Sequence, residues 1–352
     1  MTLVEHTRIS LKSTSRNTAH KLLATAWRWA MLFAAAVIPL SSFAQTKLYV
    51  VNSGSDTISV INEYTGEVTA TIKGPGHLNS IAYNAHDGLL YVPTHEGDGR
   101  VYLLDPATDS FVGEPITVGA FPSYITISPQ AHRAYVSNQF GAVSVIDTDT
   151  RTVITEIASV VAPIGSALSQ NKLYVVNNQT SEVSAIDIAS NKSLGTFPVG
   201  CFNPLDIKVD VGLHKAFVTK SSCPELAVVD TVTDTVVTTL PFPGRPRRLP
   251  QYILIDSEAH LAYVTLYWGH EEKGMYGAVA IINTIDNSIV EEIELGTRLA
   301  RMALDAPANR LYVTDRRGDR MLVVDTAARV VLGQVVVGSD PVDIAIVPER
   351  KR

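Results

Sequence analysis

The chain has 352 residues, and 46% of them are hydrophobic, so it is long and apolar enough to bury a substantial core. Its formal net charge is −6. An acidic balance argues against a general nucleic-acid-binding protein, which would present excess positive charge to phosphates.

The first segment has the pattern of a secretory signal peptide. Five Lys and Arg residues precede the apolar stretch Trp29–Leu40, and small residues follow at Ser42 and Ala44. We predict cleavage after Ala44, which leaves one domain, residues 45–352, in the periplasm or outside the cell. The alternative is an uncleaved membrane anchor, but the stretch is shorter than the about 20 residues that span a bilayer. The mature chain would carry 24 basic and 34 acidic residues, net −10, and no second apolar stretch of that length.

A five-residue run of the type Leu-Tyr-Val-x-Asn then recurs seven times. The aromatic residues of the runs, 39 to 49 positions apart, are Tyr49, Tyr91, Tyr135, Tyr174, Phe217, Tyr263 and Tyr312. Each repeat contains four short runs rich in Val, Ile, Thr and Tyr, separated by turn residues. In the third repeat these runs are Ser123–Ser128, Arg133–Ser137, Ala142–Asp147 and Arg151–Ile157. Such a period indicates a repeat architecture, and the tight turns indicate antiparallel strands.

Seven four-stranded antiparallel units predict an all-β fold, a seven-bladed β-propeller. The mature chain begins at the second strand of a blade, Leu48–Val51, and the missing first strand is expected at Val342–Val347. This C-terminal strand would close the ring and cover two sheet edges. An Asp residue ends the third run of most blades: Asp105, Asp147, Asp187, Asp230 and Asp325. We interpret these residues as turn formers rather than catalytic carboxylates.

The chain resembles the YVTN-type β-propeller repeat proteins, including the YncE-like exported ones. The resemblance rests on the Leu-Tyr-Val runs, on Ser-Val-Ile-Asp runs such as 144–147, and on Pro-x-x-Ile starts such as Pro122–Ile125 and Pro341–Ile344. It covers essentially the whole mature chain and implies the seven-bladed fold. For function it implies a range from binding platforms to lyases and lactonases, with nucleic-acid binding among YncE-like members. No catalytic motif transfers residue by residue.

Propeller geometry divides the loops between two faces. The turns from first to second strand and from third to fourth strand are short and alike, and we call their side the scaffold face. His86, His132, His214 and His260 fall in these turns on separate blades, and we interpret them as exposed turn residues rather than metal ligands. The remaining loops form the variable face, where function is expected.

The variable face departs from the repeat most at Tyr267–Tyr276, Pro241–Pro250 and Thr94–Gly99, which are predicted to be its longest connections. Arginines gather near the first two: Arg245, Arg247, Arg248, Arg298, Arg301, Arg316, Arg317 and Arg320. Guanidinium groups match carboxylates and phosphates, so these residues predict an anion-binding sector. The alternative is a solvated face paired with Glu271, Glu272, Asp315 and Asp319.

Two His-Glu pairs, His95-Glu96 and His270-Glu271, make the variable face a candidate metal or acid–base site. His77 lies on the same face. Aromatic residues also gather there: Phe121, Tyr124, Phe140, Tyr252, Tyr267, Trp268 and Tyr276. Tyr124 and Tyr252 begin innermost strands and are expected around the mouth of the central channel, as in a small-molecule or peptide pocket. Blade packing is the alternative role of these aromatic residues.

Cys201 and Cys223 flank the first two strands of blade 5, and we predict a structural disulfide between them, with two separate thiols as the alternative. The function we expect is a non-catalytic, exported, monomeric platform that binds a small molecule, a peptide or an envelope protein. The candidate ligand-binding residues are Arg245, Arg247, Arg248, Tyr252, Trp268, His270, Arg298, Arg301, Tyr124 and His77. One alternative is a lyase or lactonase in which His95, Glu96, His270 and Glu271 hold a divalent metal, and another is nucleic-acid binding.

Overall fold

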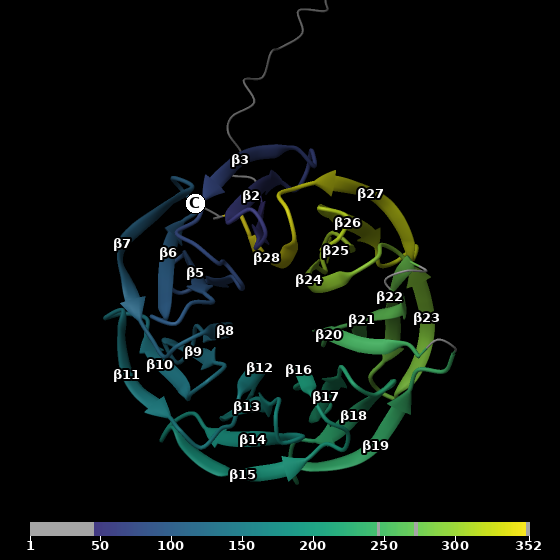
Figure 1. Ribbon diagram of the computed structural model, residues 1–352. Helices are drawn as coiled ribbons and strands as arrows, with labels where there is room; N and C mark the ends of the chain where they lie inside the picture. Colours follow the sequence, from purple (N-terminus) through teal and green to yellow (C-terminus); the bar gives the residue numbers. More distant parts are fainter. Residues whose placement is uncertain (1–45, 245–246, 271–273, 350–352) are drawn as a thin grey trace, which may run out of the picture. The chain divides into compact units, whose positions relative to one another are not determined.

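The computed structural model describes residues 46–244, 247–270 and 274–349. Within them, 28 strands form seven four-stranded antiparallel sheets arranged as a ring, which confirms the predicted seven-bladed propeller (Figure 1). The predicted signal peptide lies outside the described residues. In the described part of the chain, no helix is long and apolar enough to span a bilayer.

The strands of each blade follow one another from the channel to the rim. Blade 1 consists of β28 (Pro341–Val347), β1 (Lys47–Asn52), β2 (Thr57–Asn62) and β3 (Val68–Lys73). Blade 2 consists of β4 (Ala82–Asn84), β5 (Leu89–Thr94), β6 (Arg100–Asp105) and β7 (Ser110–Thr117). Blade 3 consists of β8 (Pro122–Ser128), β9 (Arg133–Asn138), β10 (Val143–Asp147) and β11 (Thr152–Ile157).

The other four blades repeat this order. Blade 4 consists of β12 (Pro163–Ser169), β13 (Lys172–Asn177), β14 (Glu182–Asp187) and β15 (Lys192–Pro198). Blade 5 consists of β16 (Pro204–Asp210), β17 (Lys215–Lys220), β18 (Glu225–Asp230) and β19 (Thr235–Pro241). Blade 6 consists of β20 (Leu249–Asp256), β21 (Leu261–His270), β22 (Gly274–Asn283) and β23 (Ser288–Glu294). Blade 7 consists of β24 (Leu299–Asp305), β25 (Arg310–Asp315), β26 (Arg320–Asp325) and β27 (Val330–Val336).

The ring closes where the C-terminal strand β28 pairs with β1. Lys47 lies opposite Val347 and Tyr49 opposite Ala345, so the closure expected at residues 342–347 is confirmed. In Figure 1 the first strands of the blades face the channel and the fourth strands form the rim. Because β1 pairs with β28 on one side and with β2 on the other, it has no unpaired edge.

The hydrophobic core lies between the blades. Within the described ring, seven clusters of buried side chains each join two neighbouring blades. The aromatic residue of every repeat belongs to this core, and none is more than 2% exposed. The recurring run is therefore a packing motif, which explains why it repeats without carrying a site.

Several of these tyrosines also latch one blade to the next. The Tyr174 hydroxyl of blade 4 donates a hydrogen bond to Asp234, in the turn after β18 of blade 5. Lys172 Nζ lies 2.8 Å from the same carboxylate. Equivalent latches join Tyr49 and Lys47 to Asp109, and Tyr312 to Glu63.

Replacing Tyr174 with Phe should lower the free energy of unfolding by about 1.5–3 kcal/mol. The charged Asp234 carboxylate, in a mostly buried site, would lose the hydrogen bond that the Tyr174 hydroxyl donates. Tyr135→Phe is the matched control. Among the described residues, the buried Tyr135 hydroxyl has no hydrogen-bond partner, so its removal should leave stability nearly unchanged or raise it. Urea unfolding of the two variants measures the difference, and equal losses in both would contradict the latch.

The other repeated polar residues are structural as well. Asn52, the last residue of its run, donates to Ser59 of the next strand at 3.0 Å. Asn138 and Asn177 bond Ser144 and Ser184 in the same way. The predicted turn-forming Asp residues accept backbone N–H groups of the turns that follow them, which confirms that role: Asp105, Asp147, Asp187, Asp230 and Asp325.

The prediction of a long loop at Tyr267–Tyr276 is wrong. Most of the Tyr267–Tyr276 segment continues the β21–β22 hairpin, in which Trp268 lies opposite Tyr276. The strands extend because the ladder remains paired as far as His270 and Gly274. Gly269 and Gly274 take φ values of 119° and 95°, which favour glycine near the tip.

The predicted disulfide is present on the variable face of blade 5. Cys201, before β16, is bonded to Cys223, after β17, with the two Cα atoms 6.2 Å apart.

Candidate functional site

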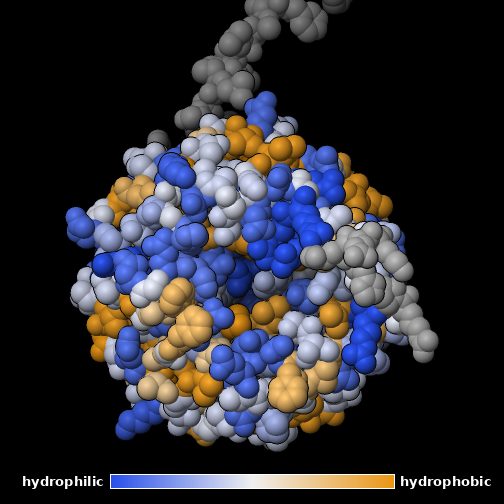
Figure 2. All heavy atoms as spheres, viewed as in Figure 1, coloured by the Kyte–Doolittle hydropathy of each residue, from blue (hydrophilic) through white to orange (hydrophobic). Residues whose placement is uncertain are grey.

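Charged and aromatic side chains from several blades line the central channel. A cavity of about 200 Å³ there is lined in part by Tyr124, Asp206, Lys208, Tyr252, Arg301 and Asp343. These residues belong to the innermost strands β8, β16, β20, β24 and β28. Figure 2 shows a hollow at the centre of the ring with hydrophilic residues around it. The structure thus brings three predicted site residues together, namely Tyr124, Tyr252 and Arg301.

Arg301 is the hub of this group. Its guanidinium lies 4.7 Å from the ring centroid of Tyr124 and 5.0 Å from that of Tyr252. Arg301 Nη1 is 3.7 Å from Asp343 Oδ2, and it donates to the carbonyl of Asn79 at 3.2 Å. Burial raises the pKa of Asp343, and the Arg301 charge opposes that rise. Arg301 is therefore committed to holding the inner strands together.

Asp206, on β16 of blade 5, plays a parallel role in the same cavity. It lies 2.8 Å from Lys208 Nζ and accepts the backbone N–H of Ile253 in the next blade at 3.2 Å. Lys208 Nζ lies 5.0 Å from the Tyr124 ring. The charges of the channel are thus arranged as internal pairs.

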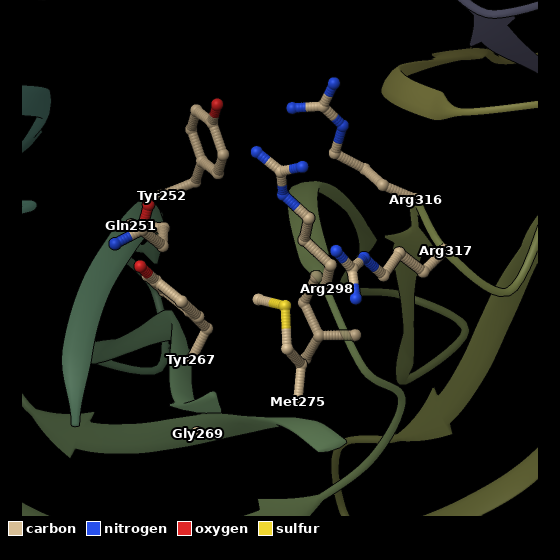
Figure 3. A pocket seen from close by; sticks show the side chains of 9 residues that line it. Gln251, Tyr252, Tyr267, Gly269, Met275, Arg298, Arg316 and Arg317 are labelled. Carbon is tan, nitrogen blue, oxygen red and sulfur yellow. The ribbon is translucent and has the colours of Figure 1, made fainter. Parts of the chain in front are cut away.

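A second cavity opens beside the channel, between blades 6 and 7, and has a volume of about 320 Å³ (Figure 3). Its lining is Gln251, Tyr252, Tyr267, Gly269, Met275, Arg298, Leu299, Arg316 and Arg317. The extended β21–β22 hairpin supplies Tyr267, Gly269 and Met275, so the irregularity found in the sequence builds one wall. The start of β24 and the loop after β25 supply the opposite wall. We call this cavity the blade 6–7 pocket.

The arginines of the blade 6–7 pocket differ in how they are held. Arg316 forms a bidentate pair with Asp340 at 2.6 and 2.7 Å, and this carboxylate raises the pKa of the guanidinium. The exposed guanidinium of Arg298 makes no hydrogen bond or ion pair with any residue that the structure describes. Figure 3 shows Arg298 between Tyr252 and Arg316, with Tyr267 and Arg317 nearby. Arg298 is therefore available to an anionic group entering the pocket.

Two predicted ligand-binding residues are engaged elsewhere. Arg248 is paired with Glu292, and its guanidinium lies 4.7 Å from the Trp268 ring centroid. Trp268 stacks on Tyr276 and packs against the core between blades 5 and 6. These side chains contact one another rather than lining the pocket, since strand alternation directs Tyr267 and Trp268 to opposite sides.

The remaining predicted residues are not brought together. Arg247 and His77 are exposed, and neither lines a described cavity. Arg320 is paired with Asp315 at 2.9 Å. Arg245 and Glu271 lie outside the described residues, as does the side chain of His270.

The predicted metal candidates of blade 2 are held by local contacts. His95 Nδ1 is 3.4 Å from the Pro122 carbonyl, and its ring packs edge-on against Phe121. Neither His95 nor Glu96 belongs to a group of three convergent metal-ligating side chains in the described part of the chain.

Two of the scaffold-face histidines lie in turns as predicted, but they are not far apart. His86 Nε2 and His132 Nδ1 each lie 2.7 Å from one oxygen of Asp149, and the two rings stack with centroids 3.7 Å apart. The two histidines lie close together although they belong to different blades, because neighbouring blades place equivalent turns side by side. A sequence signal existed, since the two histidines are 46 positions apart, about one repeat. His214 and His260 do not join this group: His214 is exposed in blade 5, and His260 lies 3.2 Å from Asp210.

Comparison with known proteins agrees with the fold. No family model matches the chain. Over 202 residues it is 24% identical to the uncharacterised protein YncE of Salmonella typhimurium, covering 55% of this chain and 54% of YncE. The chain thus spans about half the length of the curated relatives it matches.

Solved structures of similar shape perform different tasks. Hydrazine synthase of Kuenenia stuttgartiensis matches with a TM-score of 0.70 and 16% identity, over 77% of this chain and 90% of that one. The periplasmic gluconolactonase of Pseudomonas aeruginosa matches with a TM-score of 0.67 and 14% identity, over 86% of this chain and 99% of that one. At these identities the likeness shows the fold alone. The repeated runs, the closure by β28 and these matches together show a seven-bladed β-propeller that is similar to YncE.

Proposed function

We propose that this protein is an exported binding protein that holds a small carboxylate- or phosphate-bearing molecule in the blade 6–7 pocket. The observation that carries the proposal is the exposed Arg298 guanidinium, which has no partner among the described residues and lies beside Tyr252 and Arg316. Guanidinium donors bind such anions in a bidentate geometry.

The composition of the pocket supports a small ligand. Two tyrosines and Gln251 add polar groups, while Met275 and Leu299 supply apolar contact. A volume of about 320 Å³ is at the lower end for small-molecule sites, and is small for a peptide or a protein loop. The disulfide and the predicted signal peptide support export, since disulfides persist in oxidising compartments.

The residues that line the blade 6–7 pocket favour a non-catalytic binding protein over the lactonase alternative. The described lining contains no carboxylate and no imidazole, the groups that would act as a general base or hold a metal. Nucleic-acid binding is disfavoured by the predicted mature net charge of −10.

Titration calorimetry on residues 45–352 with glucose, gluconate and 6-phosphogluconate tests the proposal. These probes share a carbon skeleton and differ in anionic groups, so affinity should increase in that order and weaken as salt is added. Arg298→Met should weaken binding of the anionic probes by about 10- to 100-fold, the effect of losing a hydrogen bond between charged groups.

Arg100→Met is the matched control. It removes the same charge from the same face, in blade 2 rather than at the pocket, and should leave binding unchanged. The proposal fails if neither anionic probe binds, or if Arg298→Met binds as the parent does. Hydrolysis of gluconolactone by the parent protein would instead support the lactonase alternative.

A further inference from the structure

A second site lies on the scaffold face, at the junction between blades 2 and 3. His86 comes from the turn between β4 and β5, His132 from the turn between β8 and β9, and Asp149 from the turn between β10 and β11. One potential ligand atom from each of the three side chains lies within 4.8 Å of the other two. In the described part of the chain, no other set of three His, Cys, Asp or Glu side chains converges in this way.

Hydrogen bonds hold the backbone of the three turns that carry these side chains. The N–H of His86 donates to Asn84 Oδ1 at 3.1 Å, and that of Asp149 donates to Asp147 Oδ1 at 3.0 Å. The N–H of Thr148 donates to the His132 carbonyl at 3.1 Å, which ties two of the three turns together. The contacts of both histidines with Asp149 then bring the three side chains together.

The donor atoms suit a metal ion of the zinc class. Zn²⁺ binds imidazole nitrogen and carboxylate oxygen at about 2.0–2.2 Å, which places two ligand atoms of a tetrahedral site roughly 3.3 Å apart. Atoms already within 4.8 Å of one another need only small side-chain rotations to reach that spacing. The side chains of His86, His132 and Asp149 are 33%, 40% and 52% exposed, so an ion can enter from solvent.

We propose that His86, His132 and Asp149 form a site for one divalent transition-metal ion such as Zn²⁺, with water completing the coordination. The ion would replace the two hydrogen bonds to Asp149 and clamp blade 2 to blade 3. Tyr91 of blade 2 bonds Asp87 of its own blade rather than the next blade, so the three-residue cluster takes the place of the tyrosine latch at this junction.

Metal titration of tag-free protein comprising residues 45–352 tests this site. Calorimetry with Zn²⁺ should show one equivalent bound, and Co²⁺ should produce the visible absorption of a four-coordinate site. His86→Gln, His132→Gln and Asp149→Asn should each weaken Zn²⁺ binding at least 10-fold, because each removes one of three protein ligands. Zn²⁺ should raise the melting temperature of the parent and not of these variants.

His214→Gln is the matched control, since it removes an exposed histidine from the corresponding turn of blade 5 and should leave Zn²⁺ binding intact. Arg298→Met should also leave it intact, so failure of the blade 6–7 pocket would not affect this result. The proposal is overturned if the parent binds no Zn²⁺ at 100-fold excess. It is equally overturned if the His86 and His132 variants, shown by circular dichroism to be folded, bind Zn²⁺ as the parent does.

Discussion

A chain that ends at Asp340, and so lacks β28, should not form the native ring. Its parent for comparison is a chain that ends at Glu349. Without β28, β1 loses its partner on the channel side and the core between blades 1 and 2 loses Val342, Ala345 and Val347. The loss should approach the entire folding free energy, typically 5–15 kcal/mol for a domain. Thermal unfolding followed by circular dichroism should show no cooperative transition.

A synthetic peptide of residues 341–349 provides the specific control. Adding it to the shortened chain should restore a cooperative transition, because an exposed strand edge accepts a matching strand. A scrambled peptide of the same composition should not. If the shortened chain melted at the temperature of its parent, closure by β28 would not be what holds the ring together.

The second large effect is expected at Arg301. Replacing it with Met should lower the free energy of unfolding at neutral pH by about 3–5 kcal/mol, because Asp343 is left as a buried charge without its partner. The exposed pair of Arg329 and Glu291 gives the control: Arg329→Met should cost no more than about 1 kcal/mol. Urea unfolding compares the two variants.

The pH dependence of the Arg301→Met variant carries a definite sign. Burial already raises the pKa of Asp343, and without the arginine it should rise further above its unfolded value near 3.9. Between those two values the folded state binds more protons than the unfolded state, so stability is gained as the pH falls. The deficit should therefore be largest at neutral pH and shrink on acidification. Adding Asp343→Asn to Arg301→Met should recover most of the loss, and a double variant no better than the single one would refute the pairing.

The fold could be read from the sequence because its cause is local and repeated. Each blade needs a buried aromatic residue at the same position, and seven of them recur from Tyr49 to Tyr312. The incomplete first blade likewise required a strand at the far end. The prediction of a loop at Tyr267–Tyr276 is wrong because pairing of β21 with β22, rather than turn propensity, keeps this segment in strands.

The sites were less predictable because they depend on which way side chains point. Arg298 and Arg301 are three positions apart, yet one lines the blade 6–7 pocket and the other lines the cavity in the channel. Sequence placed both in one basic sector and could not tell which had partners. His86 and His132 were missed for a related reason, since proximity across blades depends on the geometry of adjacent turns.

The unpaired hydroxyl of Tyr135 has a mechanical consequence. At the junction of blades 3 and 4 the inner strands are tied, as Thr126 bonds Ser166 at 2.7 Å, but no tyrosine latch joins the scaffold-face turns among the described residues. Away from the inner strands, this junction is therefore held by the apolar packing of Tyr135, Val145 and Leu173, and the described residues offer no directed bond there like that between Tyr174 and Asp234. Because every blade is also held from its other side by the closed ring, the missing bond frees no blade.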